Sequence, residues 1–370
     1  MLHNWLQVPA ADFPDPADYA PHQIGGRIIR LTARKRRLPD GLSVALIGLD
    51  AEAARGIRRH LYKLSWRFDR ITVADLGDIR RGGANFLTPL LKELLDAEII
   101  PLLIGGAPAD FRAQYQAMQE LNRQLSLLTV DSAPAFGPEK DRDPEHYLSS
   151  AVHGKRRPIF HLTALGTQIQ QVDRAVEHLM ADRYYDNIRL GQAREDLSLT
   201  EPYIREADLI GLHLRSLRHG SAPARGEDYN PSGFEVEEAC RLVRYAGLSD
   251  KLRSFGIYGF RAAPDPAANE LTAATCAQLL WYFMDGVAGR WGDYPASLGG
   301  LTEYIVDQSG TGLTFWKSNR SGRWWIQAPA GRNRKGEERH RLIPCSYQDY
   351  QTACRDELPD RLLQAFQRYQ

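Results

Sequence analysis

Cysteine is scarce in this sequence of 370 residues. The four cysteines, Cys240, Cys276, Cys345 and Cys354, stand far apart and form no CxxC pair. A zinc site or a disulfide framework needs closely spaced or paired cysteines, so this spacing argues against both. We expect the thiols to be reduced and structural.

The sequence also lacks an excess of either charge and lacks long apolar runs. Lysine and arginine total 47 against 46 aspartates and glutamates, a formal net charge of +1. No overall field favours nucleic acid or an anionic membrane, and neither is expected as a partner. No segment approaches the roughly 20 apolar residues that cross a bilayer, and the first residues lack a basic stretch followed by an apolar one. We therefore expect a cytoplasmic protein.

Two common enzyme signatures are missing as well. The chain has no nucleophile-elbow motif, and no dinucleotide-binding glycine motif follows its first apolar run. The Gly105-Gly106 pair permits a tight turn, but a phosphate-binding loop would need more glycines and a following lysine. These absences exclude the dehydrogenase and α/β-hydrolase classes.

What the chain does contain is an alternation of short apolar runs and longer helical stretches. The apolar runs cover residues 43–49, 70–77, 98–106, 125–131, 157–166, 187–191, 208–217 and 254–260. They are apolar almost throughout, which is typical of strands covered on both faces. Strands that alternate with helices form βαβ crossovers. The sequence therefore predicts a three-layer α/β fold, with a parallel sheet of about eight strands and helices on both of its faces.

The pattern changes near residue 292. Short strand-like segments joined by glycine and serine turns follow there, and a closing helix begins at Asp349. We predict an N-terminal extension (1–40), an α/β domain (41–291) and a C-terminal extension with a small antiparallel element (292–370). The tryptophans Trp316, Trp324 and Trp325 of that element could form an aromatic ligand platform. Aromatic residues at strand spacing more often form a docking seam, which is the interpretation we favour.

The residues that follow the apolar runs are candidates for a site, because chemistry in an open parallel sheet gathers beyond the carboxyl ends of the strands. Four such segments are residues 105–109, 130–135, 211–218 and 256–260. In order and spacing they resemble the signature segments of the ureohydrolase family, which includes arginase, agmatinase and formimidoylglutamase. The segments NPSGF, KLRSFGIY, LTFWKSNRSGRWW and IPCSYQDYQTACRDELPDR resemble a formimidoylglutamase-like branch of that family. The resemblance implies an arginase-type fold.

The resemblance also implies a pair of Mn²⁺ ions in a cleft at these strand ends. The positions that correspond to this former metal cleft are Pro108, Asp131, Ala133, Ala135, His213, Arg215 and Gly259. Pro108, Ala133 and Ala135 stand where the family has metal ligands, and Gly259 stands where it has a glutamate on the substrate side. Asp131 alone is kept, although a histidine could also bind a metal. We therefore expect no metal cofactor.

Arg215 is the change with the largest physical consequence. A divalent metal pair needs several oxygen and imidazole ligands, including carboxylates that neutralise the ions. An arginine, with a pKa above about 12, stays charged there and repels cations. Without a metal, nothing lowers the pKa of water toward 7 to make an attacking hydroxide. Because an unpaired buried carboxylate is costly, we expect Arg215 to turn into the cleft and pair with Asp131.

The stretch after the seventh apolar run has a second interpretation. His213, Arg215 and Arg218 could form an anion pocket for a phosphate or carboxylate ligand. In the simpler interpretation, which we favour, Arg215 fills the vacated cleft and Arg218 is a polar loop residue.

The sequence thus favours a non-hydrolytic pseudoenzyme, with no catalytic residues, that binds a protein partner or a small anionic ligand. The alternative is a formimidoylglutamase-like hydrolase of C–N bonds in linear amidines, of the formimidoylglutamate, agmatine or arginine class, with one metal or none. Fold resemblance does not decide between them, because function resides in the site. The resemblance also suggests a homo-oligomer.

Overall fold

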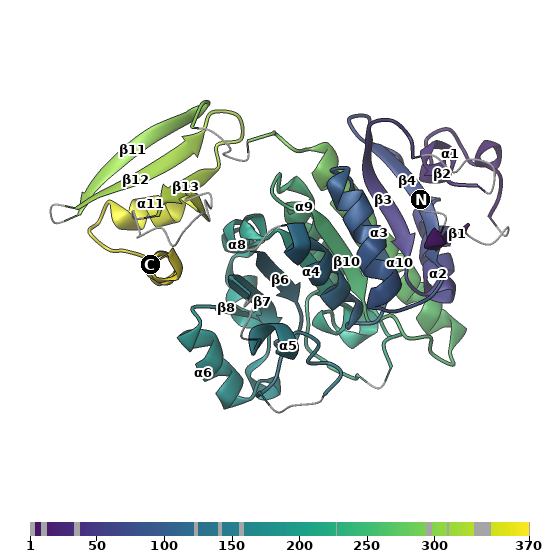
Figure 1. The fold of residues 1–370 in the computed structure, drawn as a ribbon, viewed down its shortest axis with the longest axis horizontal. Helices are drawn as coiled ribbons and strands as arrows, with labels where there is room; N and C mark the ends of the chain where they lie inside the picture. Colours follow the sequence, from purple (N-terminus) through teal and green to yellow (C-terminus); the bar gives the residue numbers. More distant parts are fainter. Residues whose placement is uncertain are drawn as a thin grey trace.

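The computed structural model describes residues 4–8, 13–32, 38–121, 125–139, 143–154, 159–226, 228–293, 298–308, 311–328 and 342–369. Its strands form a sheet of ten strands and a separate sheet of four. The larger sheet runs through the centre of the main body, and the smaller one lies beside it with the C-terminal helices (Figure 1). Among the described residues, no helix has both the length and the apolar composition that crossing a membrane requires.

Eight parallel strands form the centre of the larger sheet. They are β3 (Leu42–Gly48), β4 (Thr72–Ile79), β5 (Ile100–Gly106), β6 (Ser126–Val130), β7 (His161–Thr167), β8 (Asp186–Arg189), β9 (Leu209–His213) and β10 (Ser254–Tyr258). Their order across the sheet is β4-β3-β5-β10-β9-β6-β7-β8, and all neighbours pair in parallel. Each strand overlaps one predicted apolar run. The predicted parallel sheet is therefore confirmed.

Two short strands from the first forty residues complete this sheet at its β4 edge. β1 (Leu6–Gln7) pairs with β4 antiparallel, and β2 (Ile29–Arg30) pairs with it in parallel. Ile24, in the short helix α1 (Ile24–Arg27), is fully buried in the core. The described part of the N-terminal region is thus built into the α/β layer structure.

Helices cover both faces of the larger sheet. One face packs against α2 (Ala51–Leu61), α7 (Leu190–Glu195), α8 (Glu201–Glu206), α9 (Val236–Leu248) and α10 (Pro266–Ala288). The other packs against α3 (Ala84–Asp96), α4 (Asp110–Leu121), α5 (Ser149–Val152) and α6 (Arg174–Asp182). Each face has its own apolar core, so the predicted three layers are confirmed.

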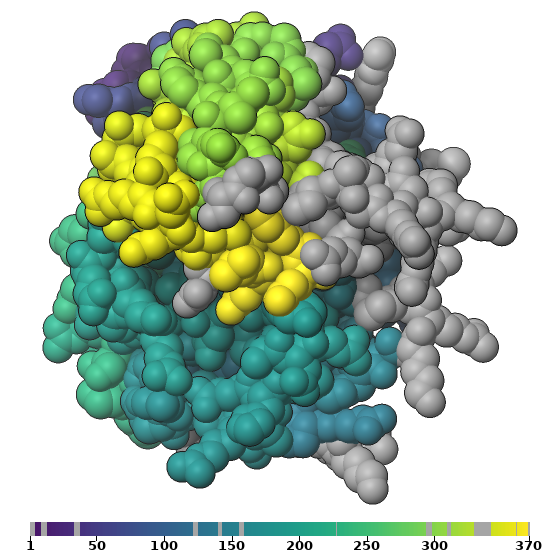
Figure 2. Space-filling view, turned by 90° about the vertical axis from the view of Figure 1, so that its left-hand side faces the viewer, coloured from purple at the N-terminus to yellow at the C-terminus, as the bar shows by residue number. Residues whose placement is uncertain are grey.

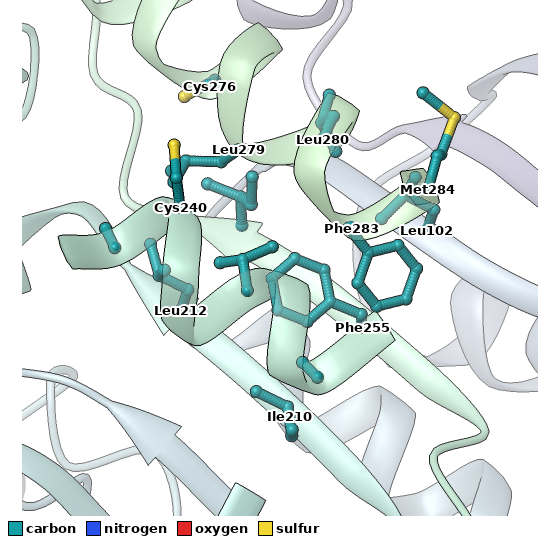
Figure 3. Packing of buried hydrophobic residues seen from close by; sticks show 14 of the residues in the cluster. Leu102, Ile210, Leu212, Cys240, Phe255, Cys276, Leu279, Leu280, Phe283 and Met284 are labelled. Carbon is teal, nitrogen blue, oxygen red and sulfur yellow. The ribbon is translucent and has the colours of Figure 1, made fainter. Parts of the chain in front are cut away.

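The core beneath α9 and α10 is closely packed (Figure 3). The rings of Phe255 on β10 and Phe283 on α10 stack with centroids 4.6 Å apart. Cys240 and Cys276 lie in the same cluster as buried free thiols. They act here as small apolar side chains.

A buried ion cluster joins α2 to β4. Nε of Arg58 donates to Asp75 at 2.7 Å, and its Nη1 donates to Asp78 at 2.5 Å. A second bond to Asp75, from Nη2, is 3.0 Å long, and the hydroxyl of Tyr62 also donates to that carboxylate. Arg58 and Asp75 are both 0% exposed. One guanidinium thus compensates two buried carboxylates.

The smaller sheet is antiparallel, as predicted for the C-terminal extension. Its strands, in spatial order, are β11 (Leu301–Gln308), β12 (Thr311–Ser318), β13 (Trp324–Gln327) and β14 (Leu342–Cys345). The helices α11 (Tyr347–Ala353) and α12 (Asp360–Tyr369) follow. Trp324 stacks on Tyr350 of α11, with ring centroids 4.7 Å apart. Trp324 therefore belongs to the internal core of this element.

Trp325, on the opposite face of β13, contacts the α/β domain. The guanidinium of Arg205 on α8 lies 4.5 Å from the centre of the Trp325 ring. It also donates to the carbonyls of Trp324 and Cys345, each at 3.2 Å. Figure 2 shows the C-terminal helices and strands, in yellow and light green, lying against the teal surface of the α/β domain. Trp325 thus has the docking role that we favoured for the aromatic residues.

Candidate functional site

Four neighbouring strands bring the candidate residues together. β5, β10, β9 and β6 are consecutive in the sheet and parallel, so their carboxyl ends lie at one edge. Pro108 follows β5, Gly259 follows β10, His213 ends β9 and Asp131 follows β6. Segments that are far apart in the sequence therefore meet at a single place.

Arg215 and Asp131 form an ion pair with two hydrogen bonds. Arg215 lies in the 3₁₀ turn η5 (Leu214–Ser216) directly after β9. Its Nε donates to Oδ1 of Asp131 at 2.5 Å, and its Nη2 donates to Oδ2 at 2.9 Å. This fork-to-fork geometry is the strongest arrangement of such a pair. The side chain of Asp131 is 1% exposed and that of Arg215 is 15% exposed. The predicted pairing is confirmed.

The electrostatics of this pair favour its charged form. Burial opposes the charge on Arg215, but the charge and hydrogen bonds of Asp131, together with Tyr147 and Glu145, outweigh burial and raise the pKa of Arg215 above its ordinary value. The N–H of Ser132 also donates to Oδ1 of Asp131 at 2.7 Å. Arg215 is therefore a permanent cation at this position.

Glu145 joins the pair from a loop that precedes α5. Nη1 of Arg215 donates to its Oε2 at 3.0 Å, and Nη2 of Arg261 donates to its Oε1 at 2.8 Å. Nε2 of His213 lies 3.5 Å from Oε2. Against the effect of burial, His213 most of all, and then Arg215 and Arg261, hold the pKa of the Glu145 carboxyl at about 2.

The ring of His213 lies over Gly259. Its Nδ1 accepts the backbone N–H of Arg215 at 3.1 Å, so the proton of the neutral ring is on Nε2, the atom that faces Glu145. Gly259 has a φ of +89°, and a Cβ built on it would lie 2.6 Å from Cε1 of His213. The imidazole thus fills the space that a side chain at position 259 would need.

The remaining cleft positions hold apolar side chains, and two of these residues accept hydrogen bonds through their backbone carbonyls. Pro108 is buried, and its carbonyl accepts the N–H of Phe111 in the first turn of α4 at 3.1 Å. Ala135 is 1% exposed, and its carbonyl accepts the N–H of Leu148 at 2.8 Å. Ala133 is half-buried. None of these three side chains has an atom that can bind a metal.

The residues present do not fit the Mn²⁺ pair that the fold family implies. Within the described ranges, no group of three or more histidine, cysteine, aspartate or glutamate side chains is placed to hold a metal ion. The carboxylates of the cleft, Asp131 and Glu145, both accept hydrogen bonds from Arg215. The cation of this site is therefore a guanidinium.

Arg218 lies apart from this cluster. Its Nη1 donates to Glu235 at 2.6 Å, and the two side chains are 54% and 42% exposed. The structure thus brings together His213 and Arg215 of the candidate anion-binding set, whereas Arg218 makes a surface ion pair. Arg261 is the second guanidinium that donates to Glu145, after that of Arg215.

Glu145 and Arg261 are the residues of this cluster that sequence reasoning missed. Arg261 comes two positions after Gly259, so the rule that chemistry follows the strand ends could have found it. Glu145 lies well past the end of β6, and a single loop glutamate is not distinctive in sequence.

The low pKa of Glu145 predicts a pH dependence. Its ordinary value is 4.5 and its value in the folded chain is about 2, so folding gains stability from this group above about pH 4.5. That gain is lost as the pH falls from about 4.5 toward 2. We expect the stability difference between the native chain and Glu145→Gln to be constant near neutral pH and to shrink across this window, as measured by urea unfolding at a series of pH values. If the free energies of unfolding of the two chains changed in parallel with pH, Glu145 would not be the group that titrates in this window.

The close contact of Gly259 and His213 predicts a large effect of a single methyl group. Gly259→Ala is expected to lower the free energy of unfolding by about 2–5 kcal/mol, because a positive φ costs about 1–2 kcal/mol and overpacking about 1–3 kcal/mol. Gly300→Ala is the matched control, since its φ is +87° and nothing lies within 4 Å of the added Cβ. It should cost only about 1–2 kcal/mol. If denaturant titrations gave the same loss of unfolding free energy for both variants, the His213 ring would be free to move away from position 259.

No family model and no curated protein matches this sequence. Solved structures do match its fold. Formimidoylglutamase from Bacillus subtilis has a TM-score of 0.62 and 17% identity, over 78% of this chain and 98% of that one. Formiminoglutamase from Trypanosoma cruzi with Mn²⁺ has a TM-score of 0.59 and 15% identity, over 69% and 96%. Agmatine ureohydrolase of Thermoplasma volcanium has a TM-score of 0.55 and 16% identity, over 73% and 95%. The chain is thus similar in fold to the arginase-type ureohydrolases, as its strand-end segments predicted.

Proposed function

We propose that this protein is a non-hydrolytic member of the arginase-type fold that acts by binding. The observation that carries the proposal is the pair of hydrogen bonds from Arg215 to Asp131. They place a permanent cation against the one carboxylate that corresponds to a family metal ligand. A metal ion there would have to displace a guanidinium and then be repelled by it.

The rest of the cleft supports the same proposal. Pro108, Ala133 and Ala135 have no ligand atoms, and the His213 ring leaves no room for a side chain at position 259. Glu145, the remaining carboxylate, is held by Arg215 and Arg261 and has a pKa of about 2. A group so acidic is a poor general base near neutral pH, because a base works best with a pKa close to the operating pH.

The test is a hydrolysis assay of the purified full-length chain with added Mn²⁺. Formimidoylglutamate, agmatine and arginine are the substrates to assay, and release of ammonia, formamide or urea is the readout. We expect no turnover above background with or without metal. Turnover that requires Mn²⁺ and disappears with a chelator would overturn the proposal.

A variant at position 215 tests whether Arg215 alone suppresses hydrolysis. Arg215→Asp returns a carboxylate to the third segment but leaves Pro108, Ala133 and Ala135 unchanged. We expect it to remain inactive, because most of the ligand atoms are still missing. Metal-dependent hydrolysis by this variant would show that Arg215 alone suppresses an otherwise complete site.

A further inference from the structure

Three cationic or proton-donating side chains converge on one carboxylate in the cleft. Arg215 donates to Oε2 of Glu145 at 3.0 Å, and Arg261 donates to Oε1 at 2.8 Å. Nε2 of His213 lies 3.5 Å from Oε2 and is a buried polar atom that makes no hydrogen bond within the described part of the chain. These donors come from the ends of β9 and β10, whereas Glu145 comes from a separate loop before α5. The strand ends thus supply the donor groups of an anion-binding site, and the loop supplies the Glu145 carboxylate that occupies it.

We propose that Arg215, Arg261 and His213 form a binding site for a small carboxylic acid, which Glu145 occupies as an internal substitute. The proposal rests on the proposed binding function and names its ligand class. A carboxylate ligand would displace the Glu145 side chain and accept the same hydrogen bonds. Its planar group matches a site in which two oxygens are bound by two different guanidiniums.

The two carboxylates of the cluster differ in how firmly they are held. Asp131 is 1% exposed, lies at a strand end and makes two bonds to Arg215 as well as one to the N–H of Ser132. Glu145 is 27% exposed and takes one bond from each arginine. Glu145 is therefore the carboxylate that a ligand can replace.

The net charge of the cluster favours an anionic ligand when the Glu145 side chain is absent. Arg215 and Asp131 compensate each other, and Arg261, 58% exposed, is paired with Glu145. Removal of Glu145 leaves one net positive charge at a partly buried site. An anion from solution restores the balance, and Arg261 is the member of the cluster that solvent reaches most easily.

The site is suited to a small ligand. The side chains of His213 and Arg215 are only 9% and 15% exposed, so an incoming carboxylate reaches them through the space that Glu145 now fills. The buried Tyr147 also lies close to this cluster, since its pKa is raised by burial and by the nearby Asp131. We therefore infer a carboxylic acid with a short chain.

The test replaces Glu145 by alanine in the full-length chain and adds acetate. Loss of a charge-assisted competitor should increase acetate affinity roughly tenfold or more over the native chain. The readouts are the rise in melting temperature in acetate against chloride at equal ionic strength, and isothermal titration with acetate. Glu235→Ala is the control, because it removes the exposed partner of Arg218 and should respond like the native chain.

Two further arms make the result decisive. Adding Arg261→Ala to Glu145→Ala should abolish the gain, and inorganic phosphate should bind more weakly than acetate. If Glu145→Ala does not fold, Glu145→Ser, which also removes the carboxylate and empties its space, undergoes the same titration. Three outcomes would overturn the proposal. The folded variant could respond equally to acetate and chloride, its gain in acetate affinity could survive Arg261→Ala, or it could bind phosphate more tightly than acetate. Failure of the proposed function would appear instead as Mn²⁺-dependent hydrolysis by the native chain.

Discussion

Replacing Arg215 by methionine is expected to lower the free energy of unfolding by about 3–5 kcal/mol. Methionine keeps the apolar stem but removes the charge, so Asp131, 1% exposed, is left buried without a cation. Removing one partner of a buried pair costs more than the pair contributed, because the desolvation of the other charge is no longer compensated. Urea unfolding near neutral pH measures the loss.

Arg218→Met is the matched control for this variant. It removes the same type of side chain three positions later, but from an ion pair whose members are 54% and 42% exposed. Exposed pairs contribute about 0–1 kcal/mol, so little change is expected. Adding Asp131→Leu to Arg215→Met should recover much of the loss, since no unpaired charge then remains. Similar losses for the two single arginine variants would contradict the structural role of Arg215.

Replacing Arg58 by methionine is expected to cost at least as much, at the upper end of about 3–5 kcal/mol. Arg58 is 0% exposed and compensates Asp75 and Asp78, which are 0% and 5% exposed. Burial already raises the pKa of Asp78 above its ordinary value, and Arg58 opposes that effect. Without Arg58, one carboxyl should take up a proton. The loss in unfolding free energy should therefore be smaller at pH 5 than at pH 8.

The next residue of the same helix supplies the control. Arg59 pairs with Glu270 at 2.8 Å, but the two side chains are 51% and 50% exposed. Arg59→Met should change the free energy of unfolding by less than about 1 kcal/mol and show no such pH dependence. If Arg59→Met lowered the free energy of unfolding as much as Arg58→Met, the loss would come from the positive charge on α2 in general. It would then not be specific to the buried ion cluster of Arg58.

The fold could be predicted from the sequence because its strands are buried on both faces. β5 and β9, for example, are buried at every position, which gives the continuous apolar runs seen in the sequence. Their order across the sheet, with β10 between β5 and β9, could not be obtained from such runs. Strand order depends on tertiary packing between distant segments, which local periodicity does not encode.

The candidate site was predictable in part. The Asp131 and Arg215 pair followed from two rules, that strand ends at one sheet edge meet and that a buried carboxylate needs a partner. Glu145 could not be found this way, because it approaches from a loop and contacts Arg215 seventy positions later in the chain. Arg218 matches the simpler interpretation of a polar loop residue, since it follows the 3₁₀ turn η5 that contains Arg215 and pairs with Glu235.

The most direct test of the central claim is a titration of the purified full-length chain with Mn²⁺, followed by electron paramagnetic resonance and calorimetry. The account predicts no tight Mn²⁺ site in the cleft, and a binding isotherm that is the same for the native chain and Asp131→Asn. Two bound Mn²⁺ ions per chain that are lost in Asp131→Asn would show that Arg215 yields the cleft to metal, and would contradict the account.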